Sequence, residues 1–167
     1  MRTEARTARK LAATAAVALL LGGCLKTEEF PVEPSILYKE FKSFGDSASV
    51  VITFTDGDGD IGLGQGDTNG VYAPGQPYYH NLFIEYYTLE NNVWSAPFPF
   101  TLPLYYRVPV VTPTGQNKAL EGEIAVALKP WPTLPGTTGD TIRYSVKLVD
   151  RALHESNVVY TDRIIVP

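Results

Sequence analysis

Short runs of alternating apolar and polar residues recur from Ile36 onward, separated by clusters of Gly, Pro, Asn and Asp. Runs of this kind, rich in Val, Ile, Tyr, Phe and Thr, are typical of β-strands with one buried and one wet face. The clearest run sets an apolar face, Ile142, Tyr144, Val146 and Leu148, against a polar face, Arg143, Ser145 and Lys147. The pattern predicts seven strands, at about 36–43, 48–55, 81–89, 104–111, 121–129, 140–149 and 157–166.

The rest of the pattern argues against helices. No segment after residue 24 carries a long repeat of 3.6 residues, and many of the chain's 13 prolines lie within 97–135, where they would break a helix. Seven short strands predict an all-β domain over 36–167, built as an immunoglobulin- or fibronectin-like β-sandwich. A small barrel is the alternative. There is no internal repeat.

Residues 1–23 have a different pattern. Four basic residues and one acid come first, then an uncharged apolar run from Leu11 to Leu21, then two glycines. This order is that of a secretory signal peptide. The apolar run is too short for a transmembrane helix, which needs about 20 residues.

The residues Leu21-Gly22-Gly23-Cys24 resemble the lipobox of bacterial lipoproteins. The resemblance implies that Cys24 is lipidated and becomes the first residue after cleavage, with residues 24–35 as the lipidated end and linker. Leu25, where an Asp usually retains such proteins at the inner membrane, favours the outer membrane, on either its periplasmic or its surface face. The alternative is an incidental cysteine in an ordinary signal peptide. Cys24 is the only cysteine, so no disulfide can form within the chain.

The charge balance limits the partners. The signal holds four of the chain's 14 basic residues and one of its 18 acidic ones, which leaves 10 and 17, a formal net charge of −7. A net acidic domain argues against nucleic acid and anionic lipid headgroups as partners, and it suits a cation.

The candidate cation site follows a predicted strand. Asp56, Asp58 and Asp60 alternate with glycines, which permit a backbone curl that brings the carboxylates together. Hard oxygen ligands without nearby His or Cys predict calcium. In an EF-hand comparison Asp67 would be the last ligand, but Ile61 stands where that motif needs Gly, and a strand leads in.

A second argument for an ion is the length of the loop. About 25 residues without a strand pattern follow residue 55, and unstructured connections beyond about 12–15 residues are uncommon unless they are functional or disordered. Asp140 and Asp150, near predicted strand ends, are possible further ligands. The alternative is a flexible acidic loop without metal.

Residues 52–63, together with Asp150-Arg151-Ala152-Leu153 and Ser156-Asn157-Val158-Val159, resemble a group of small, uncharacterised Ig-like lipoproteins of the Bacteroidetes. The resemblance implies a compartment and a fold, and no activity.

Little else points to chemistry. His80 and His154 have no metal-ligand spacing, and motifs for a nucleophile elbow, a zinc protease or a phosphate loop are absent from the sequence, so we predict a non-enzymatic protein. Exposed aromatics, with Trp94 and Trp131 as candidates, could instead bind a glycan or an envelope protein. The simpler interpretation of these rings is a sandwich core.

Overall fold

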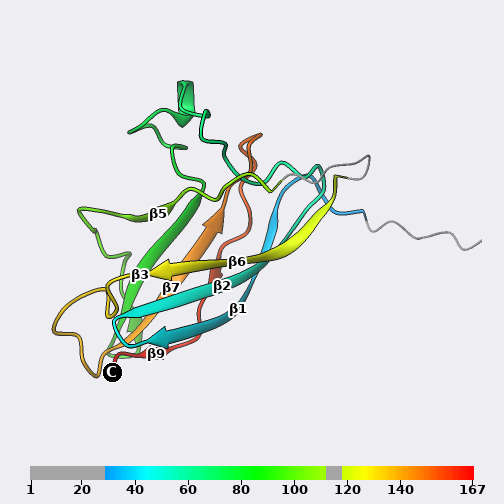
Figure 1. Ribbon diagram of the computed structural model, residues 1–167. Coiled ribbons are helices and arrows are strands. Elements are labelled where there is room, and N and C mark those ends of the chain that lie inside the picture. The colour runs from blue at the N-terminus through cyan, green and yellow to red at the C-terminus, as the bar shows by residue number, and fades with distance from the viewer. Residues whose placement is uncertain (1–28, 112–117) are drawn as a thin grey trace, which may run out of the picture.

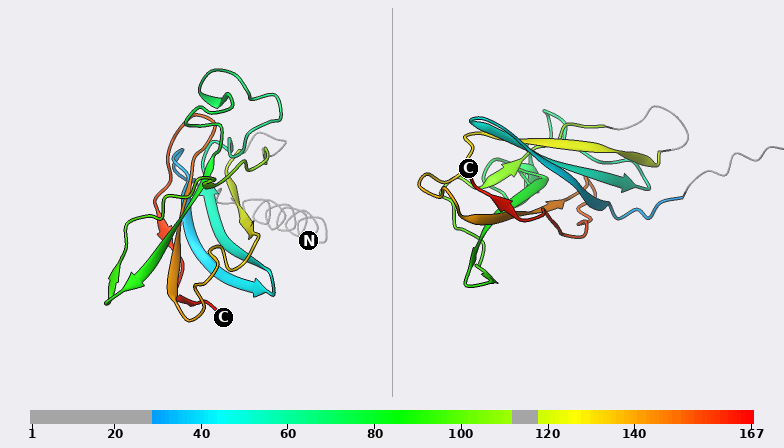
Figure 2. Two further views of the ribbon diagram at one scale, coloured as in Figure 1. Left: turned by 90° about the vertical axis from the view of Figure 1, so that its left-hand side faces the viewer. Right: turned by 90° about the horizontal axis from the view of Figure 1, so that it is seen from below.

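The computed structural model describes residues 29–111 and 118–167 as two antiparallel sheets packed face to face (Figures 1 and 2). The first sheet has the order β1-β2-β6, and its strands are β1 (Ser35–Phe44), β2 (Ser47–Asp56) and β6 (Leu120–Leu128). The second has the order β4-β3-β7-β8, with β3 (Leu82–Glu90), β4 (Val93–Trp94), β7 (Thr141–Leu148) and β8 (Val159–Tyr160). Two short strands complete it: β5 (Leu104–Tyr106) pairs with β3, and β9 (Ile164–Ile165) pairs with β7.

The predicted β-sandwich is confirmed. Strands β1, β2 and β6 correspond to A, B and E of an Ig-like sandwich, and they face β4, β3, β7 and β8, which correspond to C′, C, F and G. The two sheets stay separate, so the alternative of a small barrel is wrong. Within the described ranges the only helix is the 3-10 turn η1 (Gly70–Tyr72).

The core follows from alternation along β2 and β7. The apolar face predicted for β7 is fully buried, and it packs with the inward residues of β2 in one cluster that includes Val50, Ile52 and Phe54. Burying this apolar surface supplies the main drive for the two sheets to associate. The polar face of β7 is less wet than predicted, because Ser145 is only 4% exposed.

Two predicted strands are shorter than expected. The segment 104–111 is a strand only over β5, because beyond Tyr106 the Val108 amide donates to the side chain of Asn81, at 2.7 Å, instead of to a β3 carbonyl. The segment 157–166 splits into β8 and β9, and β4 was not predicted at all. Between β8 and β9 the hydroxyl of Thr161 accepts a hydrogen bond from the Tyr144 amide at 3.0 Å, while the Thr161 amide donates to the Tyr144 carbonyl.

The connection from β2 to β3 contains no strand, and it is fixed at its beginning by buried side chains and one isolated β-bridge. Its tip, which carries η1, projects beyond the sheets (Figure 1). Its beginning is anchored by Ile61 and Leu63, both buried, and Leu63 forms a parallel bridge with Pro109. The long loop therefore has a packed root and an exposed tip.

Replacing Thr161 with Val should lower the free energy of unfolding by about 1–3 kcal/mol, because the buried Tyr144 amide would lose its acceptor. Thr161→Ser keeps the hydroxyl and should cost less than Thr161→Val. Urea unfolding of both variants checks this, and equal losses would contradict it.

Candidate metal centre

The candidate site lies where a strand of each sheet ends. Asp56 is the last residue of β2, and Asp150 comes two residues after the end of β7. These strands belong to opposite sheets and end at the same end of the sandwich. Carboxylate oxygens of Asp56, Asp60 and Asp150 lie within 4.8 Å of one another, and we call these three residues the Asp triad.

Two members of the Asp triad are removed from water. Asp56 is fully buried and Asp150 is 1% exposed, while Asp60 is half-buried. Oδ2 of Asp56 accepts a hydrogen bond from the Asp60 amide at 2.9 Å. Oδ1 of Asp56 is buried with no hydrogen-bond partner. An ionised carboxylate in this position needs a proton or a cation.

The electrostatics of the site agree with that need. Desolvation raises the pKa of Asp56 to about 6, and the charges of Asp58, Asp60 and Asp150 act in the same direction. The pKa of Asp60 is also raised, first by desolvation and then by Asp150 and Asp58. The site therefore disfavours its own negative charge unless a counter-ion is present.

Asp150 already has a partner. Its Oδ1 accepts the His154 amide at 2.8 Å, and its Oδ2 lies 2.8 Å from Nδ1 of His154. The carboxylate raises the pKa of His154, because it stabilises the imidazolium. Asp60 accepts the Arg151 amide at its carbonyl (3.3 Å) and more weakly at Oδ1 (3.4 Å). Within the Asp triad, Asp56 is therefore the residue with a buried carboxylate oxygen that has no hydrogen-bond partner.

The two glycines between the aspartates are required by close approach. The Gly57 amide donates to the Pro31 carbonyl at 2.8 Å, and a Cβ at Gly57 would lie 2.2 Å from the carbonyl oxygen of Phe30. Gly59 has φ +69°, and a Cβ there would lie 1.9 Å from the Lys118 carbonyl oxygen. The Asp-Gly-Asp-Gly-Asp spacing thus lets the loop pass between two other segments of the chain.

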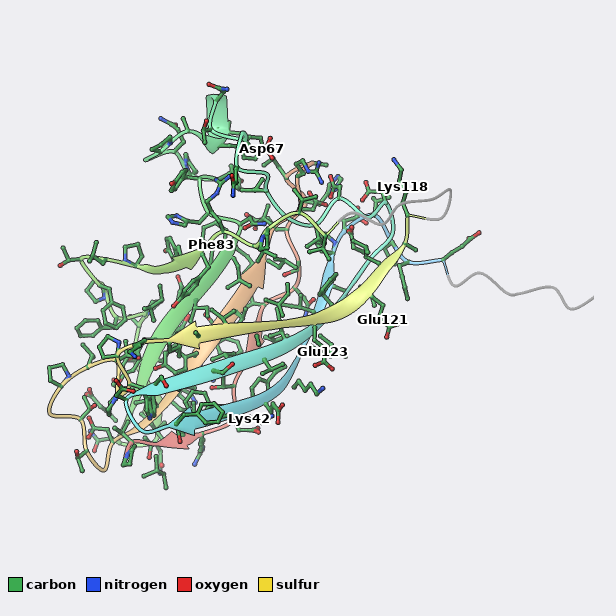
Figure 3. The ribbon with its side chains drawn as sticks, viewed as in Figure 1. Lys42, Asp67, Phe83, Lys118, Glu121 and Glu123 are labelled. Carbon is green, nitrogen blue, oxygen red and sulfur yellow. The ribbon has the colours of Figure 1, made fainter. Side chains whose placement is uncertain are left out.

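The other predicted ligands have different surroundings. Asp58 lies outside the Asp triad, although its Oδ1 is buried without a hydrogen-bond partner and its charge acts on Asp56 and Asp60. Asp67 lies in the projecting loop, away from Lys118 (Figure 3), and its Oδ2 accepts the Gly64 amide at 2.7 Å. Asp67 therefore closes a turn of that loop, and the structure brings Asp150 to the triad in its place.

Asp140 does not join the site. It precedes the start of β7, whereas Asp150 follows its end, so the two lie at opposite ends of that strand. Asp150 carries only a weak sequence signal, a lone carboxylate two residues after a buried strand. Asp56 at the end of β2 is 94 positions earlier in the chain, so the meeting of the two carboxylates depends on the fold.

The two candidate tryptophans differ in exposure. Trp131 is 3% exposed and packs edge-on against Phe41, with ring centroids 5.0 Å apart, so little of its ring is open to a ligand. The expectation of an exposed platform is therefore wrong at Trp131. Trp94 is half-buried under the guanidinium of Arg143, at 4.3 Å.

The donor set is chemically simple. The Asp triad offers only carboxylate oxygens, and Nδ1 of His154 is engaged with Asp150. Such a set suits a hard divalent cation and does not suit zinc or copper, which prefer nitrogen and sulfur donors. The structure thus presents a group of three acidic residues able to hold a metal ion.

Comparison with protein-family models, curated proteins and solved structures gives no match. No helix of the described ranges is long and apolar enough to cross a membrane. The predicted signal 1–23 and the lipidation residue Cys24 lie outside the described residues.

The raised pKa of Asp56 predicts a pH effect in chelator. Its folded pKa of about 6 exceeds the ordinary value of 3.8, so the folded state keeps a proton that the unfolded state has released. Raising the pH through this window therefore lowers the free energy of unfolding. In Asp56→Asn this loss is absent.

Urea midpoints of both proteins in EDTA, from about pH 4 to about pH 7, check the prediction. The urea midpoint of the variant should rise relative to that of the wild type as pH rises, because the variant has no carboxyl group at this position to titrate. The amide that replaces it can still accept the Asp60 N–H. A difference that is constant with pH would contradict the assigned cause.

Proposed function

We propose that the protein is a lipid-anchored cell-envelope module whose domain binds Ca²⁺ through the Asp triad for structural purposes, without catalysis. The observation that carries the proposal is the buried, unpartnered Oδ1 of Asp56 beside two further carboxylates. A bound cation would pair that oxygen and relieve the repulsion within the triad.

Calcium suits the site better than magnesium. Ca²⁺ takes six to eight oxygen ligands in flexible geometry, whereas Mg²⁺ requires a near-ideal octahedron. The three carboxylates come from the end of β2, from the loop that follows it and from the loop after β7, and Asp58 has a further buried oxygen without a partner. The remaining ligands would be main-chain carbonyls or water.

A structural role follows from where the ligands lie. An ion held by Asp56 and Asp150 would link the end of β2 to the end of β7, and so one sheet to the other. In antibody domains a disulfide links the equivalent strands B and F. This chain has a single cysteine and cannot form such a bond within itself. Because Asp56 and Asp150 are almost completely buried, an ion between them has little room for a substrate.

The lipid anchor is supported by the sequence alone. The basic, apolar and small-residue segments before Cys24 give it the setting of a lipoprotein cysteine, and Leu25 favours the outer membrane. Several acyl chains on one residue would hold the protein stably, because stable anchoring takes two lipid signals and each buried methylene contributes about 0.8 kcal/mol.

Calcium should raise the melting temperature of the purified protein. At about a hundredfold excess over Kd the ion stabilises the fold by about 2.7 kcal/mol, which is roughly 5–10 °C for a domain of this size. Asp56→Asn should melt higher than wild type in EDTA at neutral pH, because a buried charge is gone, and it should lose the calcium shift.

The matched control is Asp140→Asn, which removes an exposed carboxylate from the opposite end of β7 and should change neither result. Magnesium at equal concentration should give a smaller shift than calcium. Absence of a shift in millimolar calcium, or an equal loss in Asp140→Asn, would reject the site.

Lipidation predicts that cells fed radiolabelled palmitate incorporate the label into the wild-type protein and not into Cys24→Ser. The variant should also leave the detergent phase for the aqueous phase on phase separation. Labelling that persists in Cys24→Ser would place the acyl chains elsewhere.

A further inference from the structure

The outer face of the second sheet carries a small depression. Pairs of outward residues lie opposite each other across β3 and β7, and they form three successive rows: Phe83 with Lys147, Glu85 with Ser145, and Tyr87 with Arg143. Ser145 is the smallest of the six side chains, so the middle row is the lowest. A cavity of about 190 Å³ opens there, lined by Phe83, Glu85, Tyr105, Ser145, Lys147 and Val158. We call this cavity the Glu85 pit.

One wall of the Glu85 pit is aromatic. Phe83, near the start of β3 (Figure 3), lies opposite Tyr105 of β5, and their rings meet edge-on with centroids 4.9 Å apart. The ammonium of Lys147 lies 5.5 Å from the Phe83 ring centroid and 3.0 Å from the Glu155 carboxylate. An apolar ring and a hydrogen-bond donor therefore stand side by side.

The floor of the pit presents an oriented acceptor. Oε2 of Glu85 accepts a hydrogen bond from the Tyr87 hydroxyl at 2.7 Å and lies 3.5 Å from the Ser145 hydroxyl. Oε1 of Glu85 forms no hydrogen bond with any residue of 29–111 or 118–167. The carboxylate is thus held by one oxygen and free at the other.

A second cavity, also of about 190 Å³, adjoins the pit. It shares Glu85 and Tyr105 with the pit and is otherwise lined by Ile84, Leu104 and the proline-aromatic segment Pro97, Phe98, Pro99, Phe100 and Pro103. In the row of Tyr87 and Arg143, next to the pit along the two strands, the Arg143 guanidinium stacks over the rings of Tyr160 and Trp94 at 4.1 and 4.3 Å. The pit therefore lies within a longer aromatic surface.

We propose that the Glu85 pit binds one neutral pyranose unit of an oligosaccharide, with a neighbouring unit in the adjoining cavity. A pyranose has an apolar C–H face, which would pack on Phe83 and Tyr105, and hydroxyls that both donate and accept. Glu85 accepts from them and Lys147 donates to them.

The charges argue for a neutral ligand. The lining of the pit holds one acid, Glu85, and one base, Lys147, whose ammonium is already paired with Glu155, so the pit offers no net attraction to a sugar acid or a phosphorylated ligand. A wholly apolar ligand would strip water from Glu85 and leave it unpaired, which is unfavourable. The site lies on a sheet face, while the Asp triad lies at the end of the sandwich, so this inference does not rest on the calcium proposal.

The test is calorimetric titration of the full-length protein in detergent with four neutral probes, namely cellotetraose, maltotetraose, mannotetraose and xylotetraose, and with the acidic tetragalacturonate. We expect at least one neutral probe to bind and tetragalacturonate not to bind. Phe83→Ala and Glu85→Gln should each weaken the binding about tenfold, since each removes one specific contact. Ser145→Leu, which fills the pit, should abolish it.

The matched control is Phe44→Ala on β1 of the other sheet, a phenylalanine that is 60% exposed, and its affinity should equal that of the wild type. Each variant's calcium-dependent melt, or its urea transition if calcium has no effect, reports whether the fold is intact. Binding by none of the neutral probes overturns the proposal and leaves the surface to a protein partner. Undiminished binding in folded Phe83→Ala and Glu85→Gln, or equal weakening by Phe44→Ala, overturns it as well.

Discussion

The apolar packing of β2 against β7 is the interaction on which the rest of this structure depends, and it also brings Asp56 and Asp150 together at one end of the sandwich. Apolar burial between β2 and β7 sets the two sheets face to face, and the same packing forces the carboxylates at the strand ends together. Hydrophobic association and electrostatic repulsion are thus coupled: the better the core packs, the more closely the charges approach. The fold relieves part of the repulsion through His154 and main-chain amides, and the open oxygen of Asp56 remains.

The glycines in the loop after β2 are explained by contacts with residues distant in sequence. Read alone, glycines between aspartates suggest freedom of the backbone. In the structure they mark places where other segments pass too closely for a side chain, at Phe30 on one side and Lys118 on the other. The glycines are therefore needed where other segments of the chain cross the loop, and these contacts hold the loop in one conformation.

Features that depend on a local pattern, such as the alternation along one strand or the residues at its end, could be predicted from the sequence. The alternation along β7 gave its buried face, and the Asp run gave two members of the Asp triad, Asp56 and Asp60. The third member was only one of several possibilities, because Asp67 is near in sequence and Asp150 is near in space. The signal and lipid predictions concern residues outside the described ranges and stay predictions.

The misses have the same physical origin. Nothing local distinguishes a buried Trp131 from an exposed ring, because Trp131 lies in the connection after β6 and is covered by Phe41 of β1, a residue distant in sequence. The sequence did not predict the break between β8 and β9. There the Tyr144 amide donates to the Thr161 hydroxyl instead of to a main-chain carbonyl, and this contact depends on how the two segments lie in the fold. The two-residue strand β4 exists only as a partner for the end of β3.

The amide of Gly57 bonded to the carbonyl of Pro31 has a mechanical consequence. A pull on the chain from its amino end enters the domain at this contact. It next reaches Ile36, whose amide and carbonyl are both held by the side chain of Asn157, at 2.9 Å each. Tension is thereby passed through Gly57 to the loop after β2, and through Asn157 to the segment before β8, before it can separate β1 from β2. The Asp triad lies at the same end of the molecule, so under the proposals made above the stiffness of the end that receives the load would vary with cation concentration.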